Sequence, residues 1–270
     1  MNKLSVSQIS TLRWDLEADV HAYYERGFNG IGLYRPKVED FGIERTAELL
    51  AERSMTATSL SWAGGFTGSD GRSFEESVSD GIAAVLQAAE LGAETVIILA
   101  GGKNNHIKTH LHRVLCQALR RIAAVASEHG VKVALEPFHP GCGDEWSFVN
   151  DLDATLDIID RVDNPSLGLV FDTYHQGMDD EVIRAFADYA PYINLVQLGD
   201  GRHSPNGEMN RCLLGEGRIP LMELMDLLVR HSYQGAVEVE LIGEDIEHIG
   251  YDEVLDHTRQ FLSQTLPLRC

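Results

Sequence analysis

The sequence predicts an α/β protein whose strands and helices alternate to form a closed (β/α)8 barrel, the TIM barrel. Short apolar runs rich in β-branched residues alternate with longer segments of helical spacing along nearly the whole chain. Such alternation favours parallel strands joined by crossover helices. No Pro- or Ser-rich linker interrupts the series, and about 250 residues is the usual size of such a barrel. We therefore expect residues 1–270 to form one barrel domain.

Each element of the barrel is expected at a definite place in the chain. The strands are expected at 4–10, 30–34, 56–62, 95–100, 131–136, 167–172, 193–198 and 236–241. The helices are expected at 14–27, 42–53, 74–92, 109–130, 151–162, 179–190, 221–232 and 252–264. Several of them end at a glycine (Gly27, Gly92, Gly130), which accepts the left-handed conformation of a helix end. A doubly wound open sheet is the alternative, but it calls for a glycine-rich phosphate loop after the first strand, and residues 7–14 contain no glycine.

Composition and charge narrow the class of partner. The formal net charge is −20, which disfavours nucleic acid and anionic membrane surfaces, so we expect a small-molecule substrate and allow for a homo-oligomer. The N-terminus lacks the apolar stretch of a signal peptide, and no run is long and apolar enough to span a membrane. The four cysteines are scattered, and we expect ordinary thiols in a reducing cytoplasm: Cys116, Cys142, Cys212 and Cys270.

Oxygen-bearing side chains gather at the ends of the last four expected strands. The fifth strand ends on Glu136, the sixth on Asp172 and the eighth at Glu240, and the seventh carries Gln197. The active site of such a barrel lies at the C-terminal ends of its strands, so these side chains should face one mouth. Three carboxylates in a setting of low dielectric constant repel one another unless a cation lies between them. We therefore predict one divalent metal ion bound by Glu136, Asp172, Gln197 and Glu240.

A single acid at a strand end could instead cap the following helix or pair with an arginine. Four oxygen donors in register on neighbouring strands favour the metal site. Carboxylate and amide oxygens suit Mn²⁺ or Mg²⁺ best, with Co²⁺ or Zn²⁺ as further candidates.

The stretches that carry these residues resemble the sugar phosphate isomerase/epimerase superfamily of xylose isomerase-like TIM barrels. The matching stretches are LEPFHP (135–140), LGLVFDTYH (167–175), VQLGD (196–200), NRCLLGEGRIPL (210–221) and GAVEVEL (235–241). The resemblance extends over nearly the whole chain. The superfamily includes ketohexose 3-epimerases, inosose isomerases and dehydratases, hydroxypyruvate isomerases and endonuclease IV.

The resemblance implies a role for each matching residue. Glu136 and Glu240 match glutamates that bind the metal and serve as an acid/base pair, and Asp172 matches a metal-binding aspartate. His175 and Arg211 match residues that contact the substrate. Where the family commonly has histidine, this chain has Gln197, a variant associated with the 3-dehydroshikimate dehydratase branch. The endonuclease IV branch does not fit, because its extra histidines are absent from the early strands.

Two other residues near strand ends are candidates for contact with the substrate. His139 follows the fifth strand and could shuttle a proton or bind the substrate, although an ordinary loop histidine is the alternative. Trp62 ends the third strand and could form a wall of a sugar site, although packing in the core would also explain it.

The chemistry that these residues predict is removal of a proton from the carbon next to a carbonyl group. A metal and a carboxylate pair would make this chain a divalent-metal-dependent isomerase or epimerase of a small sugar or polyhydroxy ketone, working through an enediolate. Loss of a β-hydroxyl from the same enolate would make it a dehydratase of the 3-dehydroshikimate type. A non-catalytic sugar-binding barrel is the third alternative, and the intact acidic residues argue against it.

Overall fold

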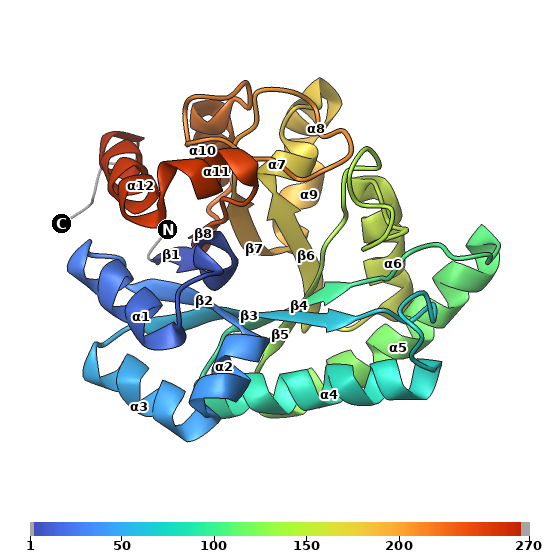
Figure 1. The fold of residues 1–270 in the computed structure, drawn as a ribbon. Coiled ribbons are helices and arrows are strands. Elements are labelled where there is room, and N and C mark those ends of the chain that lie inside the picture. Colours follow the sequence, from blue (N-terminus) through green and yellow to red (C-terminus); the bar gives the residue numbers. More distant parts are fainter. Residues whose placement is uncertain (1–2, 266–270) are drawn as a thin grey trace.

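The strands of the computed structural model, which describes residues 3–265, close into a barrel in chain order (Figure 1). All neighbouring strands are parallel, and β1 pairs with β8 to complete the ring. The predicted fold class is therefore confirmed. The strands are β1 (Leu4–Ser7), β2 (Gly30–Tyr34), β3 (Thr56–Gly64), β4 (Thr95–Leu99), β5 (Lys132–Leu135), β6 (Leu167–Asp172), β7 (Ile193–Leu198) and β8 (Val237–Val239).

Helices surround the ring of strands, and most lie where the sequence places them (Figure 1). These are α1 (Leu16–Glu25), α3 (Ile43–Glu52), α4 (Phe74–Leu91), α5 (Lys108–His129), α6 (Leu152–Val162), α10 (Leu221–Arg230) and α12 (Tyr251–Thr265). Their ends follow local chemistry. Ser73 and Glu76 form a reciprocal capping box at the start of α4, and Gly92 and Gly130 end α4 and α5 in the left-handed conformation.

The structure differs from the predicted elements in several places. The first expected strand, 4–10, is strand only to Ser7 and continues as a 3-10 helix, η1 (Gln8–Thr11). The expected helix 179–190 is divided into α8 (Asp180–Arg184), α9 (Phe186–Tyr189) and η2 (Ala190–Tyr192), because Ala185 leaves the helical conformation. Three short helices were not expected: α2 (Arg35–Phe41), α7 (Thr173–Gln176) and α11 (Glu244–Ile249).

A buried ion pair holds the segment after β1 in place. Lys37 on α2 lies 2.7 Å from Asp19 on α1 and also donates to the backbone oxygens of Gln8 and Thr11. The side chains of Gln8 and Thr11 donate to the same carboxylate. These bonds fix η1 beside the barrel mouth.

The interior of the barrel has an apolar half and a polar half. Strands β4 to β7 contribute most of a small apolar cluster, which comprises Ile97, Leu99, Ala134, Phe138, Val170, Leu195 and Ala236. Across the ring, β1 to β3 contribute buried serine and threonine side chains and two glycines of β2. Among residues 3–265, no helix is both long enough and apolar enough to cross a membrane.

Candidate active site

The strand register brings the predicted acidic and amide residues to the same barrel mouth. Asp172 at the end of β6 lies opposite Gln197 of β7, while Glu136 and Glu240 directly follow β5 and β8. All four side chains are buried. Successive side chains of a strand point to opposite sides, so residues two apart point to the same side. Glu136, Asp172 and Gln197 each lie two residues beyond an interior residue (Ala134, Val170 and Leu195), and so point into the barrel.

One group of side chains is close enough to bind a metal ion. Potential ligand atoms of Glu136, Asp172 and His175 all lie within 4.8 Å of one another, and all three residues are buried. His175 lies on α7, the short helix that follows β6, one turn beyond Asp172. The sequence predicted it as a substrate contact, and the structure places it next to the carboxylates.

Arg211 connects the carboxylates on two strands. Its Nη2 donates to Asp172 Oδ2 at 2.8 Å and to Glu240 Oε1 at 3.0 Å, and only 1% of the residue is exposed. The guanidinium also lies over the ring of Tyr174, 4.8 Å from its centre. Arg211 thus contacts two of the predicted metal-binding residues directly, which neutralises part of their charge.

The loop that carries Arg211 is held by Asp200. This buried carboxylate accepts backbone N–H groups from Gly215, Gly217 and Ile219 at 2.8, 3.1 and 3.3 Å. Gly217 faces the carboxylate so closely that a Cβ there would lie 2.0 Å from Asp200 Oδ1. Asp200 therefore fixes the path of the chain that brings Arg211 into the barrel.

Gln197 has the orientation expected of an oxygen ligand. Its Nε2 donates to Glu240 Oε2 at 2.7 Å. Within residues 3–265, its buried Oε1 finds no hydrogen-bond partner. A buried carbonyl oxygen without a partner is unfavourable, and a cation would satisfy it. The donor set of Glu136, Asp172, Gln197 and Glu240 therefore fits a divalent metal that prefers oxygen ligands.

The hydrogen bonds of His175 show which ring nitrogen carries the proton. The backbone N–H of His139 donates to Nδ1 of His175 at 3.3 Å, so Nδ1 is an acceptor. Burial lowers the pKa of His175 to about 4, so the ring is neutral and its proton lies on Nε2. Nε2 is buried, has no partner among the described residues and lies 3.9 Å from Asp172 Oδ2. His175 therefore offers an N–H donor to a ligand at the carboxylates rather than a metal-binding lone pair.

Burial and mutual repulsion affect the two glutamates differently. Burial raises the pKa of Glu136 well above its usual value, and the charges of Glu240 and Asp172 raise it further. Burial and the charge of Asp172 also raise the pKa of Glu240. The charge of Arg211 opposes the rise in both glutamates, but among the described residues Arg211 hydrogen-bonds to the Glu240 carboxylate and not to that of Glu136. Of the two, Glu240 is the better supported as an anion and Glu136 is the better supported as a proton carrier.

A pocket of about 220 Å³ opens above these residues. Its floor includes Glu136, Gln197, Arg211 and Glu240, and Arg211 is the one cationic side chain lining it within residues 3–265. Its walls are mostly apolar and aromatic, with Ile9, Leu12, Trp62, Leu99, Trp146 and Met209 among them. Trp62 and Trp146 meet edge to face, with ring centres 5.5 Å apart. The structure thus places Trp62 in a wall of the pocket.

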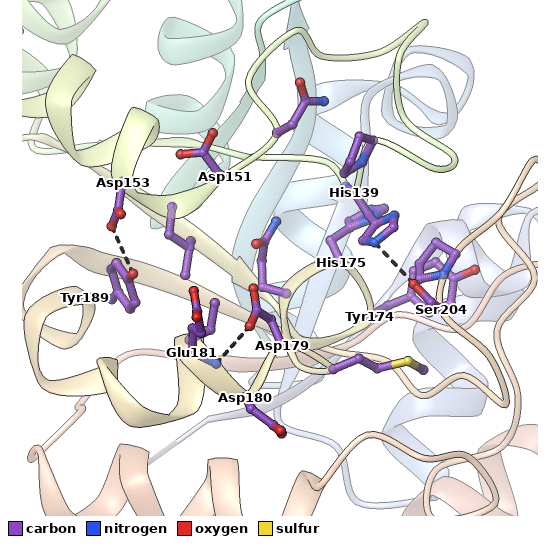
Figure 2. Close-up of a pocket in the computed structure, with 17 residues that line it drawn as sticks. His139, Asp151, Asp153, Tyr174, His175, Asp179, Asp180, Glu181, Tyr189 and Ser204 are labelled. Atoms are coloured by element: carbon purple, nitrogen blue, oxygen red, sulfur yellow. Dashed lines mark hydrogen bonds between the residues drawn. The ribbon is translucent and has the colours of Figure 1, made fainter.

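His139 faces a separate groove. Figure 2 shows this larger groove, of about 720 Å³, with His139 and Ser204 on one side and acidic side chains such as Asp151 and Asp179 on the other. Both ring nitrogens of His139 have partners, since Nδ1 accepts the N–H of Gly141 and Nε2 lies 3.3 Å from Ser204 Oγ. His139 does not line the pocket above the carboxylates, and its contact with the site is through its backbone N–H to His175.

Sequence reasoning missed one buried acid, Glu238. It lies two residues before Glu240 on β8 and is fully buried. Burial raises the pKa of Glu238 to about 7, although hydrogen bonds from Ser59 and Thr58 oppose this. The alternation of AVEVEL indicates that residues 238 and 240 point to the same side, and this signal could have identified Glu238 together with Glu240.

Comparison with known proteins agrees with this architecture. The family model described as "Xylose isomerase-like TIM barrel" matches residues 20–263. The chain is 23% identical over 268 residues to an inosose isomerase of Bacillus velezensis, which covers 96% of this chain and 93% of that enzyme. It is 27% identical over 154 residues to an inosose isomerase of Halalkalibacterium halodurans, so that match spans about half of each chain, 55% and 53%.

Solved structures show the same fold. A structure of the IOLI protein with a bound zinc atom matches with a TM-score of 0.84 and 20% identity, covering 98% of each chain. A structure of D-psicose 3-epimerase with D-tagatose from Clostridium cellulolyticum H10 matches with a TM-score of 0.80 and 18% identity, covering 99% of this chain and 100% of that one. Together with the family match, these likenesses lead to one conclusion: this chain belongs to the xylose isomerase-like TIM barrel family.

Proposed function

We propose that the protein is a divalent-metal-dependent isomerase or epimerase of a small, uncharged polyhydroxy ketone. The observation that carries this proposal is a group of buried side chains at one barrel mouth. Glu136, Glu240 and Gln197, whose Oε1 has no partner within residues 3–265, line the pocket, and ligand atoms of Asp172 and His175 lie within 4.8 Å of one of Glu136. Relatives described as inosose isomerase and D-psicose 3-epimerase support the reaction class. The zinc atom of the IOLI protein supports a divalent metal.

Glu136, Asp172, Gln197 and Glu240 would hold the cation. When bound, the cation supplies Lewis-acid polarisation of a substrate carbonyl, which makes the neighbouring C–H more acidic. Glu240 takes that proton as general base, the electron pair of the C–H bond moves into a carbon–carbon double bond, and the π pair of the carbonyl moves onto its oxygen. A protonated Glu136 then gives its proton to the opposite face of the same carbon while the carbonyl re-forms, which gives an epimer. If the former carbonyl carbon takes the proton instead, its oxygen ends as a hydroxyl and the neighbouring hydroxyl loses its proton to become the new carbonyl, which gives an isomer. His175 Nε2–H and Arg211 orient the substrate oxygens.

The charges of the site favour an uncharged substrate. Arg211 is the one cationic side chain that lines the pocket within residues 3–265, and it is already paired with Asp172 and Glu240, so no unpaired cationic side chain is left to bind a phosphate or a carboxylate. The neighbouring mouth loops add acidic side chains, among them Asp144, Glu145 and Glu208. An anionic substrate would therefore lose solvation without gaining a counter-charge.

A metal-dependent dehydratase of the 3-dehydroshikimate type is the second candidate. Gln197, at the position where the family commonly has histidine, is the observation that favours it. Its substrate carries a carboxylate, and the lack of an unpaired cationic side chain lining the pocket within residues 3–265 argues against that substrate.

The decisive experiment compares substrates on the metal-loaded enzyme. Purified protein is analysed for bound metal, stripped with a chelator and reloaded with Mn²⁺. It is then assayed with a panel of ketohexoses and inososes, and with 3-dehydroshikimate while the ultraviolet absorbance of an aromatic product is followed. We expect metal-dependent interconversion of an uncharged ketone. Conversion of 3-dehydroshikimate alone would support the dehydratase, and no turnover in any assay would contradict the proposal.

A further inference from the structure

Two arginines bind the backbone at the end of β3, where Trp62 forms a wall of the pocket. Arg35, the first residue of α2, donates from Nη1 to the backbone oxygen of Trp62 at 3.3 Å. Arg72, in the loop before α4, donates from Nη2 to the backbone oxygen of Gly64 at 2.8 Å. Both bonds join a charged side chain to the main chain of the strand that carries Trp62.

The pairing of β3 with β4 is irregular at the same place. Ser61 and Trp62 of β3 together face the single residue Ile97 of β4, because the register shifts between Leu60 and Ala63. An extra residue of this kind interrupts the ladder, leaves a residue unpaired and changes the direction of a side chain. Regular strand pairing therefore does not fix the direction of the Trp62 ring, and the bond from outside the ladder does part of this.

Asp80 on α4 binds both arginines. Its Oδ1 lies 2.8 Å from Nη2 of Arg35, and its Oδ2 lies 3.0 Å from Nη1 of Arg72. The three side chains are between 15% and 33% exposed, so water and salt screen the two ion pairs only in part. Arg35 forms no other ion pair among residues 3–265, whereas Arg72 also pairs with Asp70. Loss of the Asp80 charge would leave Arg35 without an anion and beside a second guanidinium.

Arg35 connects α4 to two wall residues of the pocket. It directly follows Tyr34, whose side chain lines the pocket together with that of Trp62. Gln87, two turns beyond Asp80 on α4, accepts from Nε of Arg35 at 3.2 Å. The planar guanidinium thus has three partners at once, an arrangement that a lysine does not reproduce. One face of α4 therefore reaches the aromatic wall of the pocket through Arg35.

We propose that Asp80 is a positioning residue that, through Arg35, fixes Trp62 in the wall of the substrate pocket. This inference rests on the proposed function, because it takes the pocket as the substrate site. Asp80 does not line the pocket, and its partners bind the backbone of β3 rather than the carboxylates of the site. Its loss should weaken substrate binding and leave metal binding unchanged.

The first test observes Trp62 directly, by fluorine NMR of protein labelled with 5-fluorotryptophan. The chain has three tryptophans, so three resonances are expected, and the variants Trp14→Phe, Trp62→Phe and Trp146→Phe assign them. We expect Asp80→Asn, which keeps the size of the side chain, to shift or broaden the Trp62 resonance. The Trp146 resonance should change with it, because the two rings meet edge to face, and the Trp14 resonance should stay where it is.

Kinetics of the Mn²⁺-loaded enzyme give the second test. We expect Asp80→Asn to raise KM by about tenfold with kcat within about threefold of wild type, because the change removes substrate binding rather than chemistry. Mn²⁺ affinity, measured by calorimetry, should not change. In a Trp62→Ala background the same substitution should alter KM by less than about twofold, because the positioned ring is gone.

The matched control is Glu75→Gln, because Glu75 on α4 also pairs with an arginine, Arg121, but is well exposed. It should leave the Trp62 resonance and KM as in the wild type. An Asp80→Asn protein with an unshifted Trp62 resonance, or with unchanged KM, would overturn the inference, as would equal effects on KM with and without Trp62. If Asp80→Asn does not fold, Arg35→Lys keeps the charge but not the planar group, and unchanged values in that variant would also overturn the inference.

The fluorine spectrum needs no turnover, so it separates this inference from the proposed function. A wild type that converts no ketone contradicts the proposed function, and in that protein the Trp62 resonance still decides whether Asp80 positions the ring. An active wild type whose Trp62 resonance is the same in Asp80→Asn contradicts the role of Asp80 alone.

Discussion

Arg211 Nη2 lies 2.8 Å from Asp172 Oδ2 in a part of the barrel that is almost closed to solvent. The same nitrogen reaches Glu240. Replacing Arg211 with methionine would leave these carboxylates buried without their counter-charge. We expect the metal-free variant to lose about 3–5 kcal/mol of unfolding free energy in urea, the usual effect of breaking a buried ion pair. Saturating Mn²⁺ should restore part of that loss, because the cation neutralises the same carboxylates.

The matched control for Arg211→Met is Arg202→Met. Arg202 forms ion pairs with Glu216 and Asp245, but about half of its side chain is exposed. Exposed pairs contribute about 1 kcal/mol or less, so this variant should unfold close to the wild-type urea midpoint. Equal losses in the two variants would contradict the central role of Arg211.

Glu240→Gln tests the assignment of the general base. The amide keeps the size of the side chain but cannot accept the substrate proton. We expect kcat to fall by about 10² or more while Mn²⁺ remains bound, as general-base removal usually does. Turnover is measured by polarimetry or chromatography and bound metal by calorimetry. Turnover within about tenfold of wild type, with metal bound, would show that another group takes the proton.

The apolar walls of the pocket predict a preference among ketoses. Ile9, Leu12, Leu99 and Met209 offer no hydrogen-bond partner to hydroxyl groups far from the metal. A hydroxyl buried against such a wall loses its bonds to water, which costs about 1–3 kcal/mol. We therefore expect kcat/KM for a 6-deoxyketohexose to exceed that for the parent ketohexose by about tenfold. A 6-phosphate should be the poorest substrate of the three.

A polar side chain in the wall should reverse this preference. Met209→Gln offers a hydrogen-bond partner of similar length, and we expect it to improve kcat/KM for the parent ketohexose relative to the 6-deoxy analogue. Met222→Gln on the exposed surface of α10 is the control. An unchanged ratio in Met209→Gln would show that the distal end of the substrate does not contact this wall.

The ion pair between Lys37 and Asp19 should support the mouth of the barrel. It is buried, and its bonds fix η1, which carries Ile9 at the edge of the pocket. Lys37→Met removes one partner and should lower the unfolding free energy in urea by about 3–5 kcal/mol. The double variant Lys37→Met with Asp19→Leu should be less destabilised, because no unpaired charge remains buried. A double variant that is worse than Lys37→Met would contradict this explanation.

Cys142 should be a slowly reacting thiol despite its place beside His175. Burial raises its pKa to about 11, so only ~0.1% of it is thiolate at pH 8. Because the pKa is raised, alkylation by iodoacetamide should be slow at neutral pH and should rise about tenfold per pH unit up to pH 10. Peptide mass spectrometry of folded and urea-unfolded protein measures this rate at Cys142 alone. Equal rates in the two states would contradict the prediction.

The barrel could be predicted from the sequence because several independent patterns indicate the same fold. Alternating runs, helix-ending glycines and acids at successive strand ends all indicate one fold and one mouth, and the structure brings Glu136, Asp172 and Gln197 together there. The walls of the pocket could not be predicted, because Leu99 and Met209 come from distant segments that only the closed ring brings together. Glu238 was missed for a related reason: on a barrel strand an inward side chain is expected to be apolar.

The division of the expected helix 179–190 into shorter helices could not be predicted from the sequence either. Its apolar spacing is compatible with one helix, and the break at Ala185 has no proline or glycine to mark it. Cys270 lies outside the described residues, and its predicted ordinary thiol remains a prediction, as do the cytoplasmic location and the homo-oligomer.

Gly32 shows that transplanting this centre to another barrel would take more than copying its acids. The absent side chain at this position is what gives the carboxylate of Glu238 a place to sit. A designer who grafted only the oxygen donors onto a scaffold with alanine or valine there would close that space from the far side of the ring. A scaffold for this site would therefore need the glycine on β2 as well as the oxygen-bearing side chains at the ends of β5 to β8.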